Sequence, residues 1–292
     1  MPDTFFVILN PACGRGQGER LLPQIEYFLA LHQLDFEIYK TSQPLEATRV
    51  ANEASAKFSV VVAAGGDGTV NEVANGLVGT NAAFGVIPIG SGNDFAKCLH
   101  LAPDVSPSIQ ALKNGHRRRV DIAKLNDRYF VNGLGIGLDG AAAHRNRSIK
   151  KLKGKAAYLW SAVYEALHYK AQTIKMRSES WQYEGIFMMA GASNGQCHGG
   201  DFLLAPQAKI DDGLLDIHLI TNMHPLRRLR QIPKVKKGQH LTLPEVHMHR
   251  SPWLEFSSSQ TLLAHLDGEP FVVSPGTTRI ELIPNGFTVI SG

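Results

Sequence analysis

The sequence predicts an α/β domain at the N-terminus followed by a β-rich, sandwich-like domain at the C-terminus. Apolar runs at residues 5–9, 59–63 and 83–89 each end in a glycine-rich turn that opens a helix. This alternation is typical of a buried parallel sheet with helices on its faces. After Gly115 the pattern changes to short alternating strands separated by turns, which favours a sandwich or an open barrel.

The composition is that of an ordinary globular protein, with 43% hydrophobic and 19% charged residues among 292. Cys13, Cys98 and Cys197 form no CxxC pair, so neither a disulfide framework nor a zinc site is indicated. Asp3 stands where a signal peptide would be basic, and no apolar run is long enough to span a bilayer. We therefore expect a cytoplasmic protein.

The first strand, residues 5–9, leads into a glycine-rich turn at residues 10–18 and a helix from about residue 19 to residue 32. This turn is a candidate contact for a phosphate-bearing ligand. A strand at residues 36–41 and a helix at residues 45–57 follow.

Thr41 ends the second strand at the edge where ligands collect in parallel sheets. A turn residue before a helix is nearly as good an explanation of Thr41.

The central stretch, residues 64–73, joins a buried strand to a helix through Gly65, Gly66 and Gly68. Glycines let backbone N–H groups approach an anion, and a helix N-terminus adds partial positive charge, so this turn predicts a phosphate site. Asp67 would repel phosphate unless a magnesium ion intervened. The alternative is a tight turn in which Asp67 or Thr69 caps the helix.

A third glycine-rich turn, residues 90–96, again places an acid at the end of a strand. Asp94 begins the next helix and is a candidate metal or hydroxyl contact. An acid in the first turn of a helix also interacts favourably with the helix dipole, so Asp94 has a structural explanation as well.

These motifs resemble those of the lipid kinases. The GGDGT stretch, residues 65–69, resembles a signature shared by diacylglycerol, sphingosine and ceramide kinases, NAD kinases and, more loosely, phosphofructokinases. The Asn-Glu pair that follows it narrows the resemblance to lipid kinases. The resemblance implies a Rossmann-like, NAD kinase-like N-terminal fold and ATP with Mg²⁺. It implies nucleotide contacts at Asn10, Pro11, Ala12, Cys13, Gly14, Thr41, Gly65, Gly66, Asp67, Gly68, Thr69, Val70, Asn71, Glu72 and Ser91. Asp67 and Asp94 would act at the metal or the acceptor hydroxyl.

We expect a nucleotide-binding domain at residues 1–120 and a β-rich, substrate-binding domain at residues 121–283, with residues 284–292 able to return to the first. Within the second, residues 135–140 match GxGxxG only weakly, because no βαβ unit surrounds them, and residues 154–171 form a helix. The expected strands are residues 120–125, 129–134, 183–192, 214–220, 241–249, 253–257, 261–266, 271–273 and 279–283. His247 and His249 alternate on one strand and are assigned no site.

Two loops of the second domain resemble functional loops of the family. The resemblance places a structural metal at Asp212, with carbonyl oxygens from Lys209 and Leu214; from the residues alone, Asp212 belongs to an Asp-Gly hairpin turn. In the Asp-Gly-Glu stretch, the resemblance makes Glu269 the general base, and Asp267 is its rival. A plain hairpin tip is the remaining alternative.

The function implied is an ATP-dependent lipid kinase whose acceptor, such as diacylglycerol, enters the cleft between the domains. The alternatives are a kinase of a sphingoid base, phosphatidylglycerol or NAD, and a non-catalytic module that binds nucleotide or membrane. Two basic runs, residues 145–155 and 227–237, are either solvated faces or a surface for anionic membrane, with nucleic acid a weaker explanation. The expected partners are a membrane lipid, an anionic membrane surface bound peripherally and a second copy in a homodimer, without nucleic acid.

Overall fold

A computed structural model describes residues 2–149, 154–200 and 202–292, and the chain divides into two compact units. Unit 1 comprises Met1–Ile122 and Pro284–Gly292, and unit 2 comprises Ala123–Ile283. The strands β5 (His116–Leu125) and β15 (Gly276–Ser291) carry the chain from one unit to the other. Lys150, Lys151 and Lys153 of the first basic run lie outside the described residues.

Unit 1 is built on a parallel sheet with the strand order β2-β1-β3-β4. These strands are β1 (Thr4–Leu9), β2 (Asp35–Lys40), β3 (Val60–Gly65) and β4 (Ala83–Pro88). Every residue of β3 and β4 is buried, which explains why both segments read as continuous apolar runs. The end of β15 pairs in parallel with β4 through Val289 and Phe84, so the last residues of the chain belong to this sheet.

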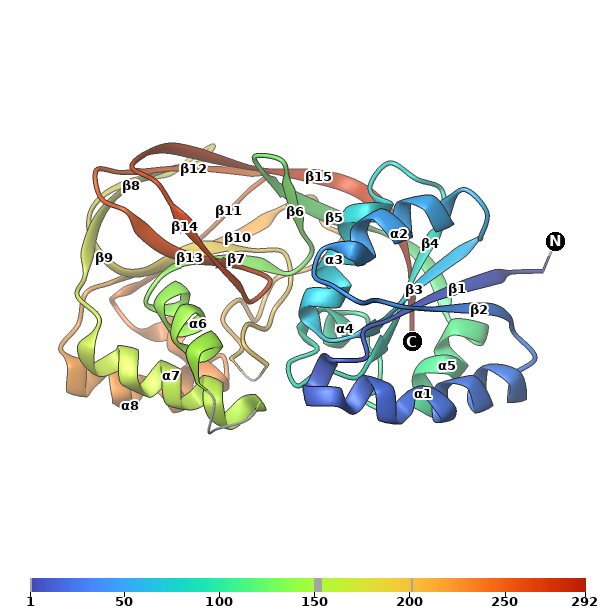
Figure 1. Cartoon of the computed structure of the whole chain (residues 1–292). Coiled ribbons are helices and arrows are strands. Elements are labelled where there is room, and N and C mark those ends of the chain that lie inside the picture. The colour runs from blue at the N-terminus through green and yellow to red at the C-terminus, as the bar shows by residue number, and fades with distance from the viewer. Residues whose placement is uncertain (1, 150–153, 201) are drawn as a thin grey trace. The chain divides into compact units, whose positions relative to one another are not determined.

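Helices cover both faces of this sheet (Figure 1). α1 (Cys13–Leu31) and α5 (Val105–Asn114) lie on one face, and α2 (Glu46–Ser55) and α3 (Asp67–Leu77) lie on the other. Strand alternation divides the core accordingly, with Val60, Val62 and Ala64 packed in one cluster with residues of α1 and α5. The predicted α/β domain is confirmed, and its turns at the carboxyl ends of the strands carry the candidate site.

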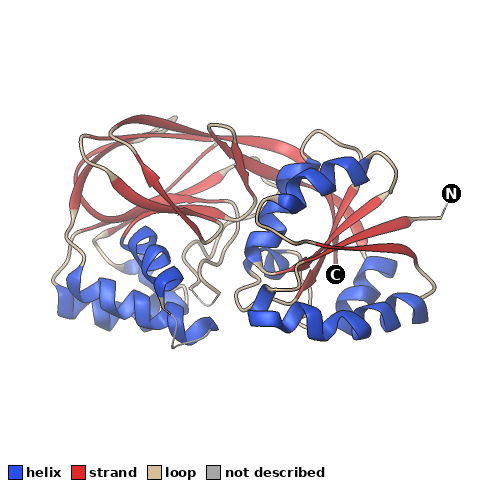
Figure 2. Cartoon of the chain, in the orientation of Figure 1, coloured by secondary structure: helices blue, strands red, loops and turns tan. Residues whose placement is uncertain are grey.

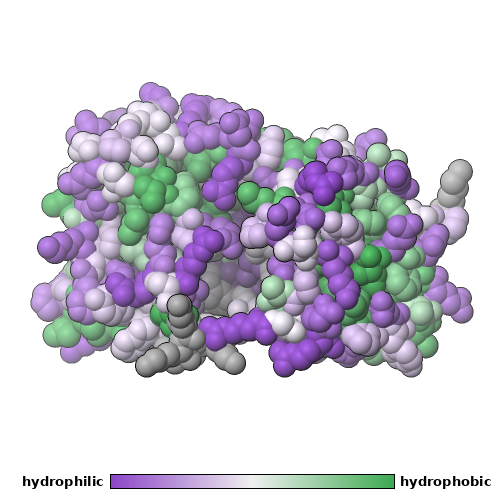
Figure 3. Space-filling model, viewed as in Figure 1, coloured by the Kyte–Doolittle hydropathy of each residue, from purple (hydrophilic) through white to green (hydrophobic). Residues whose placement is uncertain are grey.

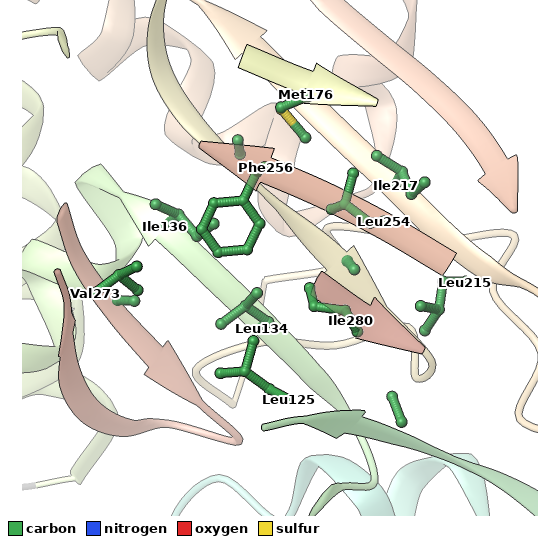
Figure 4. Close-up of a cluster of buried hydrophobic side chains, with 14 of the residues drawn as sticks. Leu125, Leu134, Ile136, Met176, Leu215, Ile217, Leu254, Phe256, Val273 and Ile280 are labelled. Atoms are coloured by element: carbon green, nitrogen blue, oxygen red, sulfur yellow. The ribbon is translucent and has the colours of Figure 1, made fainter. Parts of the chain in front are cut away.

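Unit 2 is an antiparallel, sandwich-like arrangement, as the sequence predicted. Its main sheet runs β14-β13-β7-β9-β8-β12-β15, and β10 pairs with both β9 and β11. Inward side chains such as Leu134, Ile136, Leu254 and Phe256 fill its core (Figure 4). The strands are β6 (Arg128–Phe130), β7 (Gly133–Gly137), β8 (Gln172–Arg177), β9 (Gln182–Ser193), β10 (Leu215–Thr221), β11 (Val246–Ser251), β12 (Trp253–Ser258), β13 (Leu262–Leu266) and β14 (Glu269–Val273).

Three helices lie together on one side of the strands of unit 2 (Figure 2), and the sequence predicted only α7 (Gly154–His168) among them. α6 (Leu138–Ser148) buries an aspartate and small residues, and α8 (Pro225–Lys236) buries only Arg228. α6 lacks the apolar stripe on which periodicity depends, and the apolar positions of α8 are interspersed with arginines, lysines and Pro233. The expected strand at residues 241–249 is also shorter, because η1 (Gln239–Thr242) is a 3-10 turn and β11 begins at Val246.

Candidate functional site

The turns that follow β3 and β4 approach each other closely because both contain glycine. A Cβ atom on Gly90 would lie 2.4 Å from the Cα atom of Gly66, a separation that real side chains do not adopt. The N–H of Ile89 donates to the carbonyl oxygen of Gly65 at 3.0 Å, which joins the two strand ends. The backbones of the second and third glycine-rich turns thus form one continuous surface.

Asp67 fixes the third turn from the first residue of α3. Its Oδ2 accepts from the backbone N–H of Asn93 at 3.0 Å, and its Oδ1 accepts from that of Asp94 at 2.7 Å. The carboxylate therefore lies at the N-terminus of the short helix α4 (Asp94–Cys98), where negative charge is stabilised. Asp67 does not cap its own helix, contrary to one alternative explanation of its position.

Asn93 closes the same turn in a left-handed backbone conformation, with φ of 55°. Its side-chain oxygen accepts from the N–H of Gly90 at 3.0 Å, and its Nδ2 donates to the carbonyl oxygen of Gly90 at 2.8 Å. Asn93 was not among the residues predicted to be functional. Asparagine is enriched in left-handed positions, and that preference is the signal that could have identified it.

Asp94 is buried, and its Oδ1 accepts from the Nζ of Lys97 at 3.0 Å. The two predicted acids, Asp67 and Asp94, are thus brought together through the Asn93–Asp94 backbone. Ser91, from the same turn, is exposed. The third turn therefore combines a buried acid with an accessible hydroxyl.

The first turn joins this assembly through Asn10. Its Nδ2 donates to the Oγ1 of Thr69 at 3.2 Å, and its Oδ1 accepts from the N–H of Ala12 at 3.0 Å. The N–H of Thr41 donates to the carbonyl oxygen of Leu9 at 2.9 Å, so the end of β2 lies beside the end of β1. The predicted contacts from three strands therefore share one edge of the sheet.

Residues 14–16 have left-handed backbone conformations, with φ of 56° at Gly14, 60° at Arg15 and 86° at Gly16. Regular helical geometry in α1 begins only after them, close to the expected start at residue 19. Cys13 precedes this loop, and burial raises the pKa of its thiol to about 11. Cys13 is therefore a neutral, small side chain beside the half-buried Pro11 and the exposed Ala12.

Three residues predicted to contact the nucleotide, Val70, Asn71 and Glu72, have side chains that contact other parts of unit 1. Glu72 accepts from the N–H of Ala47 at 3.2 Å through its Oε2, which places its carboxylate at the N-terminus of α2. The side chain of Val70 is buried in the core. Asn71 accepts from the Nδ2 of Asn75 within the same helix. These contacts help to position α3.

In unit 2, Asp212 lies in a turn with Gly213 at φ of +75°. Its Oδ1 accepts from the N–H of Leu214 at 3.2 Å, and its Oδ2 lies 3.8 Å from Arg250. The neighbouring Asp216 has a buried Oδ2 without a hydrogen-bond partner, and burial raises the pKa of this carboxyl. An Asp-Gly turn is present, and the orphaned carboxylate oxygen beside it suits a cation.

Asp267 and Glu269 have different surroundings. The buried carboxylate of Asp267 accepts from the N–H groups of Val131, Asn132 and Gly133 at 2.8–2.9 Å. Glu269 is exposed, and its Oε2 lies 3.9 Å from the guanidinium of Arg147. Asp267 thus braces the turn, whereas Glu269 is accessible to a reacting hydroxyl.

Comparison with known proteins identifies both halves of the chain. Residues 4–125 match the model of the diacylglycerol kinase catalytic domain, and residues 133–291 match that of the YegS C-terminal NAD kinase beta sandwich-like domain. A diacylglycerol kinase of Staphylococcus saprophyticus is 30% identical over 90% of this chain and 88% of its own length. A Pseudomonas aeruginosa protein named "Probable lipid kinase YegS-like" is 32% identical over 81% of each chain. A crystal structure of a diacylglycerol kinase from Bacillus anthracis shares the fold, with a TM-score of 0.77 and 23% identity over 99% of this chain and 97% of that one.

Proposed function

The chain belongs to the diacylglycerol kinase catalytic-domain family, and from this premise we propose that it transfers the γ-phosphate of ATP to the hydroxyl of a membrane lipid such as diacylglycerol. The observation that carries the proposal is the close approach of Gly66 and Gly90 at the carboxyl ends of β3 and β4. Such an edge, with α3 beginning there, is where parallel α/β sheets bind phosphates.

Unit 1 would hold the nucleotide with its three turns. ATP supplies the transferable phosphoryl group, and the chain supplies backbone N–H groups near Gly66 and the exposed hydroxyl of Ser91. Asn10 holds the first turn to Thr69, and Asp67 holds the third turn to α3. These hydrogen bonds fix the turns before the ligand arrives, which lowers the entropic cost of binding.

Two places in the chain offer oxygen ligands that suit magnesium: the edge of the sheet that carries the phosphate turns, and the turn around Asp212. The carboxylates of Asp67 and Asp94 provide hard oxygen atoms close to the phosphate turns, although both also take part in hydrogen bonds. Asp212, Asp216 and the backbone carbonyls of Lys209 and Leu214 could hold a second ion in a structural role, where Arg250 already offsets part of the negative charge.

Gly90→Ala should weaken ATP binding by at least about 10-fold, because the added Cβ would force the turns of Gly66 and Gly90 apart. Gly79→Ala is the matched control, since Gly79 has φ of +79° and open space around its Cα. It introduces backbone strain in the same unit without a new contact. Equilibrium binding of ATP measures both variants, and equal affinities would argue against the turns as the phosphate site.

We propose that the protein reaches its acceptor by docking on anionic membrane through α7 and α8. Leu159, Trp160 and Leu167 on α7 are exposed at helical spacing, with Trp160 53% exposed. α8 packs against α7 and presents the exposed cations Arg230 and Lys234. Figure 3 shows hydrophobic and hydrophilic residues intermixed where these helices lie in Figure 1. Among the described residues, no helix has the length and apolar character of a membrane span.

Trp160→Ala should weaken binding to anionic vesicles by at least about 10-fold, because inserting one large apolar side chain contributes roughly 1.5–3 kcal/mol. Ile186→Ala is the control, since Ile186 is 55% exposed in the same unit but lies on β9. Binding should also fall with added salt, because attraction between Lys or Arg and anionic lipid is screened. Vesicle sedimentation that is indifferent to Trp160 and to lipid charge would contradict this docking surface.

The acceptor class is tested by a screen with γ-labelled ATP, Mg²⁺ and a panel of alcohols. We expect label in diacylglycerol presented in anionic vesicles. Label in a sphingoid base or phosphatidylglycerol would redirect the substrate within lipid kinases, and label in NAD without vesicles would replace the proposal. ATP binding without label in any acceptor would indicate a non-catalytic module.

A further inference from the structure

A buried cluster of one carboxylate and two imidazoles lies inside unit 2. Asp139 comes from the first turn of α6, His198 from the segment after β9, and His265 from β13. Each is at most 7% exposed, and one potential ligand atom from each lies within 4.8 Å of the others. The cluster shares no residue with the turns assigned to ATP, to Mg²⁺ or to Glu269.

The polar atoms that face this cluster are not satisfied by the protein. The Oδ2 of Asp139, the Nδ1 of His198 and the Nε2 of His265 have no hydrogen-bond partner. A fourth side chain, the fully buried His218, has neither ring nitrogen paired, and its ring centroid lies 6.0 Å from that of His198. Each unpaired buried group costs about 1–3 kcal/mol, so four at one place indicate a missing ligand.

Glycines keep the space between these side chains open. A Cβ atom on Gly135 would lie 2.0 Å from the Oδ2 of Asp139 and 2.4 Å from the Nε2 of His265. A Cβ on Gly133 would lie 2.4 Å from the ring of His198. These two glycines of β7 leave room for the cluster, and no parallel βαβ unit requires them, because β7 pairs antiparallel with β9 and β13.

One separation within the cluster is close to that between two ligands of a tetrahedral metal ion. The Nε2 of His265 lies 3.6 Å from the Oδ2 of Asp139, beyond hydrogen-bond length. Two ligands at about 2.1 Å from a tetrahedral zinc ion are separated by about 3.4 Å. Burial holds the pKa of His198 below its ordinary value, so its imidazole is neutral and has a lone pair to donate.

We propose that Asp139, His198 and His265 bind a zinc ion in unit 2. Two imidazole nitrogens with one carboxylate favour zinc over magnesium or calcium, which take oxygen ligands. Asp139 and His198 also line a largely apolar cavity of about 100 Å³, which has room for a water molecule as the fourth ligand.

Zinc binding would change the tautomer of His265. Its Nδ1 accepts from the N–H of Gly268 at 3.3 Å, so a neutral His265 carries its proton on Nε2, facing Asp139. Ligation through Nε2 moves this proton to Nδ1 and breaks the contact with Gly268. Since Gly268 precedes Glu269, occupancy of the zinc site is linked to the turn that carries the proposed base.

The test is titration of the purified, chelator-treated full-length protein with Zn²⁺ and with Co²⁺. We expect one equivalent to bind, a higher melting temperature with Zn²⁺, and the strong visible absorption of tetrahedral Co²⁺. His198→Ala and His265→Ala should each weaken Zn²⁺ binding at least about 100-fold, a loss of about 2.7 kcal/mol. The control combines His247→Ala with His249→Ala, which removes two half-buried histidines from β11 and should leave binding unchanged.

The titration of the wild-type protein tests the proposed zinc site even if a variant fails to fold. No stoichiometric Zn²⁺ binding by the folded wild-type protein would overturn the proposal. Loss of binding in the His247 and His249 control, with retention in the folded His198 variant, would overturn it as well.

Discussion

Replacing Glu269 with glutamine should lower kcat by roughly 10²–10⁴-fold, the usual contribution of a positioned general base. The substitution keeps the size of the side chain and removes the group that would take the proton of the acceptor hydroxyl. The KM for ATP should change little, because the proposed nucleotide turns belong to unit 1 and Glu269 belongs to unit 2. Steady-state kinetics on vesicles with ATP varied at saturating lipid measure both quantities.

Asp267→Asn is the informative partner of this variant. Asp267 accepts three backbone hydrogen bonds, and an amide in its place would turn an N–H donor toward another N–H. We expect a lower melting temperature, with hydrogen bonds to a buried charge contributing about 1.5–3 kcal/mol each. A stable, inactive Asp267→Asn protein beside an active Glu269→Gln protein would reverse the assignment of the base.

Replacing Asp67 with asparagine should remove most magnesium-dependent turnover, with a loss of roughly 10²-fold or more in kcat. The substitution deletes charge near the phosphates and also removes one of the two acceptors that hold the Asn93–Asp94 backbone. A displacement of about 1 Å in a positioning group is sufficient for a loss of this size. The loss is measured as kcat over a range of Mg²⁺ concentrations, and thermal unfolding shows whether the variant is folded.

Glu53→Gln serves as the control for Asp67→Asn, because it removes an exposed carboxylate of unit 1 that forms a surface ion pair with Arg49. A surface pair of this kind contributes about 0–1 kcal/mol, so turnover should be unchanged. Near-wild-type activity in Asp67→Asn would remove Asp67 from both the metal site and the positioning of the turn.

Regular, strongly patterned parts of the fold were predictable from the sequence. The runs that became β3 and β4 are buried on both sides, that of β1 is mostly buried, and each is followed by a glycine-rich turn. α6 and α8 were not predicted. α6 buries small residues and Asp139, and the apolar positions of α8 lie among arginines, lysines and Pro233, with Arg228 as its buried side chain. Arg228 donates to backbone carbonyl oxygens of Met223 and Tyr169, contacts that no periodicity indicates.

The candidate site was predictable as a set of turns, but the partner of each side chain was not. The motif spacing predicted that Asp67 lies in the phosphate turn. The N–H groups that donate to its carboxylate belong to Asn93 and Asp94, 26 and 27 residues later in the chain. The choice between Asp267 and Glu269 depends on burial, which alternation on a strand cannot supply. The sequence did not predict the cluster of Asp139, His198 and His265, because these residues come from separate elements and do not have the spacing of a metal-binding motif.

The most direct test of the central claim is transfer of label from γ-labelled ATP to diacylglycerol in anionic vesicles by the purified protein. The account predicts a labelled lipid that extracts into organic solvent, requires Mg²⁺, and falls by roughly 10²–10⁴-fold with Glu269→Gln. Label that stays in the aqueous phase as phosphorylated NAD, or bound ATP with no labelled product, would contradict it.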